Sequence, residues 1–182
     1  ITKKIFKKKY KCKVKILGSK KYYINKFQKL KKNNFLIIPD AFETEMKFFY
    51  NFCVIAAKRY PNYKFYYRAH PSGLKYLKQF KNFKLKNLII SENTLEKDIY
   101  NCSFAIFRNS AAVFETISHG LLPVYLDDSS KLNINPLHSV LPKSCCIKKP
   151  GDLEFVIKHK NKNILIKKLQ DYNKNYFMKF NT

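Results

Sequence analysis

The sequence has 182 residues and a formal net charge of +25, from 37 Lys and Arg against 12 Asp and Glu. This length suits one domain, and a hydrophobic share of 46% supplies a full-sized core, which excludes a disordered chain. No apolar run approaches the roughly 20 residues that cross a bilayer. We therefore expect a folded domain without a membrane-spanning helix.

The positive charge comes almost entirely from lysine, since Arg59, Arg68 and Arg108 are the only arginines. Nucleic-acid sites favour Arg for bidentate recognition and place aromatic rings beside the cations. Here Lys is scattered over every segment, so we expect no nucleic-acid partner. We expect positive charge spread over the surface, with a local concentration only near Arg68 and Arg108. Attraction to an anionic membrane surface stays open.

The cysteines indicate a reducing compartment. The five are Cys12, Cys53, Cys102, Cys145 and Cys146, and none forms a CxxC pair or has zinc-ligand spacing with His. An odd count argues against a disulfide framework. We therefore expect reduced thiols in a cytoplasmic protein, and no metal site.

Short apolar runs alternate with amphipathic stretches from residue 35 onward. Strands are predicted over residues 35–38, 64–68, 87–91, 103–107 and 122–126. Helices are predicted over 42–59, 94–100, 111–119, 152–159 and 164–177, with a further helix after Ser72 that contains Leu74, Leu77 and Phe80. Strands separated by helices at this rhythm predict right-handed crossovers and a parallel sheet covered on both faces. The predicted class is α/β, with a three-layer Rossmann-like fold.

The first 34 residues do not follow this rhythm. A strand at 13–17 and a basic helix or linker at 22–32 are predicted there. We interpret residues 1–34 as the end of a preceding domain with its linker, and residues 35–182 as one Rossmann-like domain with its closing helices. Because the chain begins at Ile1 without an initiator Met, we expect it to belong to a longer polypeptide.

Ligands of open parallel sheets bind outside the carboxyl ends of the strands, which selects the loops at 40–45, 68–72 and 108–112. The last loop leads into a helix with small first residues, so a phosphate can approach the free backbone N–H groups after Ser110. Glu115, one turn further, can accept both hydroxyls of a ribose. Two plainer interpretations stay open: Ser110 as a simple N-cap, and Glu115 as a charge that complements the helix dipole.

Arg68 and His70 follow the second predicted strand. Side chains two residues apart in extended geometry project to the same side, so these two are expected to form a phosphate clamp with the Ser110 turn. Glycine-rich phosphate loops and the common hydrolase motifs are absent, and the chain has 4 Gly in all. Phosphate binding must therefore come from helix starts and side chains.

At these residues the sequence resembles a known family. The run from Phe104 to Leu126 is similar to the donor-binding segment of GT-B-fold glycosyltransferases, closest to bacterial enzymes of capsule and surface-polysaccharide synthesis. Residues 68–71, Arg-Ala-His-Pro, resemble the His-Pro motif of bacterial sialyltransferases and related capsule transferases. Residues 16–19 before 37–40 resemble the linker from the acceptor half into the donor half.

The resemblance implies the C-terminal, donor-binding half of a glycosyltransferase that moves a sugar from a nucleotide sugar to a surface glycan or lipid-linked acceptor. The donor would be CMP- or UDP-linked, without a further cofactor, and the enzyme would lie in the cytoplasm or at the inner membrane face. His70 and Arg68 would act on the phosphate in catalysis. The donor-binding residues implied are Arg108, Asn109, Ser110, Ala111, Glu115 and Glu45.

Two other functions stay open at this point. A nucleotide-sugar epimerase or a polyol-phosphate transferase would keep the fold and change the reaction. A non-enzymatic basic module for nucleic acid or anionic lipid would leave His70 and Glu115 dispensable and would lose affinity steeply with salt.

Overall fold

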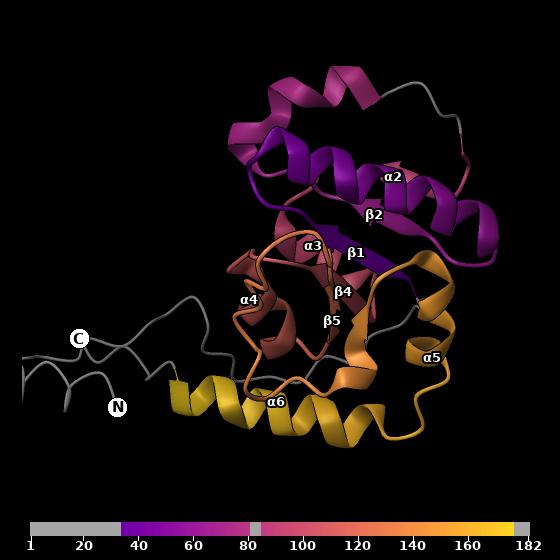
Figure 1. Ribbon diagram of the computed structural model, residues 1–182. Coiled ribbons are helices and arrows are strands. Elements are labelled where there is room, and N and C mark those ends of the chain that lie inside the picture. The colour runs from indigo at the N-terminus through magenta and orange to yellow at the C-terminus, as the bar shows by residue number, and fades with distance from the viewer. Residues whose placement is uncertain (1–33, 81–84, 177–182) are drawn as a thin grey trace, which may run out of the picture.

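The computed structural model describes residues 34–80 and 85–176 (Figure 1). The predicted strand at 13–17 and the predicted helix or linker at 22–32 lie outside these residues. The described chain forms a six-stranded sheet in the order β3-β2-β1-β4-β5-β6, and every neighbouring pair is parallel. The strands are β1 (Phe35–Ile38), β2 (Phe65–Tyr67), β3 (Leu88–Ile90), β4 (Phe104–Phe107), β5 (Leu122–Leu126) and β6 (Cys146–Ile147).

Helices cover both faces of this sheet, which gives three layers (Figure 1). The α-helices are α2 (Glu43–Arg59), α3 (Leu95–Tyr100), α4 (Ala112–Ser118), α5 (Leu153–Ile157) and α6 (Lys162–Tyr176), and the 3₁₀ helices are η1 (Pro71–Phe80), η2 (Lys143–Cys145) and η3 (Pro150–Asp152). On one face α2 packs against η1, η3, β2 and β3, and on the other α4 packs against β4, β5 and α6. The predicted α/β, Rossmann-like class is confirmed.

The central strands explain why this sheet is buried on both sides. Every residue of β1, β4 and β5 is buried, so these runs have no polar alternation. Helix α2 covers the β2 and β3 side of the sheet through side chains at three- and four-residue spacing, including Met46, Phe49 and Cys53, all fully buried. Its end is held by Asn87, whose side-chain amide donates to the carbonyls of Ala57, Tyr60 and Tyr63.

Several local differences separate the structure from the sequence predictions, besides shifts of one or two residues at the ends of helices and at the start of β4. Residues 71–80 form a 3₁₀ helix, although an ordinary helix was expected. The short strand β6 pairs with β5 in a region where no strand was predicted. The ends of β2 and β3 lie one residue inside the predicted 64–68 and 87–91. Gly120, predicted to stop the preceding helix, does so with a φ of 89°, a conformation that favours glycine.

Within residues 34–80 and 85–176, no helix combines the length and the apolar composition needed to cross a membrane.

Candidate functional site

A cleft opens at the carboxyl edge of the sheet, between the loops that follow β1 and β4. In this strand order the connections after β1 and β4 leave on opposite faces, so the two loops diverge and leave a crevice. The cleft has a volume of about 590 Å³, within the usual range for small-molecule sites. Its polar lining residues are Asp40, Arg68, His70, Asn109, Ser110 and Glu115.

The structure therefore brings together most of the residues singled out from the sequence. Arg68, His70, Asn109, Ser110, Ala111 and Glu115 all line this one cleft. Two of the proposed donor-binding residues, Arg108 and Glu45, do not line it. They are buried against each other beside it, and are described below.

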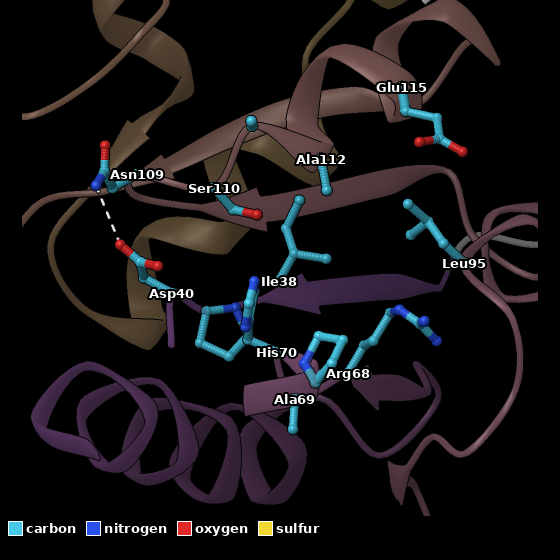
Figure 2. Close-up of a pocket in the computed structure, with 13 residues that line it drawn as sticks. Ile38, Asp40, Arg68, Ala69, His70, Leu95, Asn109, Ser110, Ala112 and Glu115 are labelled. Carbon is cyan, nitrogen blue, oxygen red and sulfur yellow. Dashed lines mark hydrogen bonds between the residues drawn. The ribbon is translucent and has the colours of Figure 1, made fainter. Parts of the chain in front are cut away.

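His70 extends from the end of β2 toward Ser110 (Figure 2). Its Nδ1 accepts a hydrogen bond from the backbone N–H of Ser72 at 3.3 Å and lies 2.7 Å from the Ser72 hydroxyl. A backbone N–H can only donate, so Nδ1 is the acceptor, and the neutral ring carries its proton on Nε2. His70 thus presents an N–H donor to the cleft without needing a positive charge.

The His70 turn is pressed closely against α2. The backbone N–H of Gly73 donates to the His70 carbonyl at 2.8 Å. A Cβ at Gly73 would lie 2.2 Å from Met46 Sδ, so only glycine fits without a shift. The absence of a Cβ at Gly73 thus lets the turn that follows His70 approach Met46 of α2 closely.

The turn after β4 forms the opposite wall. Asn109 donates from its side-chain amide to Asp40 Oδ2 at 3.0 Å, and Asp40 Oδ1 accepts from the Ala41 N–H at 2.7 Å (Figure 2). Helix α4 has Ala111 at its N-cap position, so Ser110 does not cap it with its side chain. Figure 2 shows the Ser110 hydroxyl directed into the cleft. The N-cap interpretation of Ser110 is therefore not supported.

Glu115 lies one turn into α4, beyond Ala112, and is half-buried. Figure 2 shows it on the side of the cleft where Leu95 and Arg68 lie, away from Asp40 and Asn109. Leu95 is the first residue of α3 and adds an apolar surface between these charged side chains. This end of the cleft thus combines a carboxylate with an apolar wall.

Arg68 points away from His70, toward Leu95 (Figure 2). Its Nη1 donates to the Asn93 carbonyl and, at 3.2 Å, to Asp98 Oδ2. The expected joint clamp of Arg68 and His70 on one phosphate is therefore not formed in this arrangement. His70 faces Ser110, while Arg68 belongs to the Leu95 end.

Arg108 and Glu45 form a buried ion pair. Arg108 Nη1 lies 2.7 Å from Glu45 Oε1, and the two side chains are 3% and 9% exposed. Arg108 Nη2 also donates to the Leu132 carbonyl at 2.8 Å, and Lys131 Nζ lies 3.1 Å from Glu45 Oε1. The hydrogen bond to Glu45 raises the pKa of Lys131. The pair ties together the start of α2, the end of β4 and the segment after β5.

The charge of the cleft differs from the expected positive concentration. Its lining carries one arginine, Arg68, which is paired with Asp98, and two carboxylates, Asp40 and Glu115. Arg108 is neutralised by Glu45 outside the lining. Within the residues described, no three His, Cys, Asp or Glu side chains gather as a metal site would require. An anion in this cleft would therefore depend on directed N–H donors more than on net charge.

Asp40 lies in the 40–45 loop that the carboxyl-edge rule selected from the sequence, and it lines the cleft. Sequence reasoning did not single out Asp98, a second acidic residue that shapes this site. Asp98 lies inside α3 and is fully buried beneath Arg68, and no sequence pattern marks it.

A comparison with known protein families finds none that matches this chain, and no curated protein matches it.

Proposed function

We propose that this chain is the donor-binding half of a GT-B-fold glycosyltransferase that transfers a sugar from a CMP- or UDP-linked donor to a surface glycan acceptor. The observation that carries the proposal is the convergence of His70, Ser110 and Glu115 on one cleft at the point where the strand order reverses. Rossmann-like sheets bind nucleotides at this place. The resemblance of residues 68–71 and 104–126 to donor-binding segments supports the same function.

The phosphate of the donor would lie between His70 Nε2 and the start of the 110–112 turn. Negative charge grows on the phosphate as the bond to the sugar breaks, and fixed N–H donors stabilise that charge without reorganising. His70 suits this role because Ser72 holds its Nδ1 and leaves Nε2–H as the donor. The ribose would lie against Glu115, whose carboxylate can accept hydrogen bonds from both hydroxyls.

The rest of the reaction would be assembled around this cleft. In this proposal the acceptor and the catalytic base belong to a second Rossmann-like domain that faces the carboxyl edge of the sheet. The abundant lysine side chains would favour a cytoplasmic location at an anionic inner membrane face, where a lipid-linked acceptor can be reached.

Calorimetric titration of the chain with UDP, CMP, CDP and GDP tests the proposal. We expect one of these nucleotides to bind, and Glu115→Ala to weaken it by about 1.5–3 kcal/mol, because the ribose loses a charged acceptor. Glu154→Ala is the matched control, since Glu154 pairs with Lys158 on α5 and does not line the cleft. If none of the four nucleotides binds, or if Glu115→Ala and Glu154→Ala have equal effects, the proposed function is wrong.

A further inference from the structure

A buried carboxylate lies behind the cleft wall at Arg68. Asp98 is 0% exposed, and it is surrounded by hydrogen-bond donors from the segment between β3 and α3. The Ser91 hydroxyl lies 2.6 Å and 2.7 Å from its two oxygens, and the Asn93 amide donates to Oδ1 at 3.3 Å. A charge without solvent persists only where such donors compensate it.

Arg68 completes this cluster and also reaches the cleft. Its side chain is 24% exposed, and its Nη1 uses both hydrogens, one toward Asn93 and one toward Asp98. A guanidinium has five N–H donors, so Nε and Nη2 carry three more. The pairing with Asp98 therefore sets the direction of those three donors while leaving part of the group in the cleft lining.

We propose that Asp98 is a positioning residue that fixes the Arg68 guanidinium so that its remaining donors meet the nucleotide, at the ribose end of the cleft, in one orientation. This inference rests on the proposed nucleotide-binding function and adds a residue to it. A long arginine side chain loses rotamer freedom when it binds a ligand, and prior fixation by Asp98 removes that loss from the binding step. The charge of Asp98 also lowers the net attraction of Arg68 for anions. If Asp98 only neutralised Arg68, Asp98→Asn would strengthen nucleotide binding, whereas loss of a positioning role would weaken it.

A double-mutant cycle of Asp98 and Arg68 distinguishes a positioning role from simple neutralisation. Binding of the tightest ligand among UDP, CMP, CDP and GDP is measured for the full chain, Asp98→Asn, Arg68→Lys and the double variant. Positioning predicts that Asp98→Asn and Arg68→Lys each weaken binding about tenfold, and that the double variant is no weaker than the weaker single variant. Asp152→Asn is the control, because Asp152 also accepts hydrogen bonds, from the Lys148 and Lys149 N–H groups, outside the cleft lining.

The outcomes distinguish this inference from the function on which it rests. If a nucleotide binds and Asp98→Asn leaves its affinity unchanged or raises it, or if the two single effects multiply, the positioning role is wrong while the proposed function stands. If no nucleotide binds, the positioning role and the proposed function are both wrong. Nitrogen-15 NMR of the arginine side chains gives a readout without ligand: Arg68 should show slowly rotating Nη groups in the unaltered chain and averaged ones in Asp98→Asn. Averaged signals in both chains contradict the inference.

Discussion

Asn109 and Asp40 join the two loops that border the cleft, through a hydrogen bond of 3.0 Å from Asn109 Nδ2 to Asp40 Oδ2. One residue follows β1 and the other follows β4, and these are the neighbouring strands at which the chain reverses its direction across the sheet. The bond therefore sets the width of the cleft at its base, where Ser110 begins the opposite wall.

Replacing Asn109 with Asp should open this base, because two carboxylates would face each other where an amide now donates. We expect the free energy of unfolding to fall by about 0.5–1.5 kcal/mol, since an exposed hydrogen bond is lost and a repulsion is added. Nucleotide affinity should fall with it, and urea unfolding and calorimetry measure the two effects. Asn101→Asp is the control, because its amide makes a bond of 3.0 Å, to the Lys97 carbonyl at the end of α3, outside the cleft lining. Equal losses of nucleotide affinity in both variants would show that the Asn109 bond has no special place at the cleft.

The Arg108–Glu45 pair should contribute strongly to stability. Arg108→Met leaves the Glu45 carboxylate buried without its main partner, which costs about 3–5 kcal/mol in comparable sites. The pair Lys158–Glu154 has a similar separation of 2.6 Å but is exposed, so Lys158→Met should leave the free energy of unfolding almost unchanged. Chemical unfolding of the two variants side by side measures the difference. Similar losses of unfolding free energy in the two variants would mean that the Arg108–Glu45 ion pair contributes no more to stability than an exposed one.

Much of the sheet could be predicted from the sequence because its strands are fully apolar runs between turn residues. Residues 35–38 and 122–126 match β1 and β5 at both ends. The strand β6 could not be predicted, because it has two residues and exists only through pairing with β5. The spacing of Leu74, Leu77 and Phe80 is three residues throughout, which is the period of a 3₁₀ helix and could have indicated η1.

The candidate site could be predicted as far as local position, and not as far as side-chain direction. The carboxyl-edge rule placed His70, Ser110 and Glu115 at one cleft from their distance to the strand ends alone. The same rule placed Arg108 there, but its guanidinium turns to Glu45, which is 63 residues away in the chain. The direction of a long side chain depends on partners that are distant in the sequence, and a local sequence pattern cannot identify those partners.

Replacing Gly73 with alanine should destabilise the fold. The new methyl would lie 2.2 Å from Met46 Sδ, and Met46 is fully buried, so its side chain must move against the core or the turn must shift. Overpacking of this kind costs about 1–3 kcal/mol. Gly151→Ala is the control, since its nearest neighbour would be Arg59 Cζ at 3.7 Å, an ordinary contact. In a Met46→Ala background the cost of Gly73→Ala should shrink, and an unchanged cost in thermal unfolding would show that Met46 is not the obstacle.

The cysteines of the described chain should react slowly with thiol reagents. Burial raises the pKa of Cys53, Cys102 and Cys146, and raises that of Cys145 to about 11. The reactive form is the thiolate, so at pH 7.5 these thiols stay protonated and inert. In a Cys12→Ser variant we expect Ellman's reagent to react much more slowly with the folded chain than with the urea-unfolded chain. A thiol that reacts in the folded chain as fast as in the unfolded one would contradict this burial.

Under the proposed function, His70 should act mainly on turnover of the complete enzyme, because the charge that its Nε2–H would stabilise develops as the donor bond breaks. His70→Ala is expected to lower kcat by about 10²–10³, with a smaller change in nucleotide affinity, by comparison with the loss of one donor from an oxyanion-stabilising site. His70→Gln should recover part of kcat, since its amide nitrogen can donate from nearly the same place. His138→Ala is the control, because His138 contacts the Asn135 carbonyl and does not line the cleft. If His70→Ala weakens nucleotide binding and leaves kcat unchanged, the imidazole holds the ground-state phosphate only, and stabilisation of the leaving group must come from the 110–112 turn.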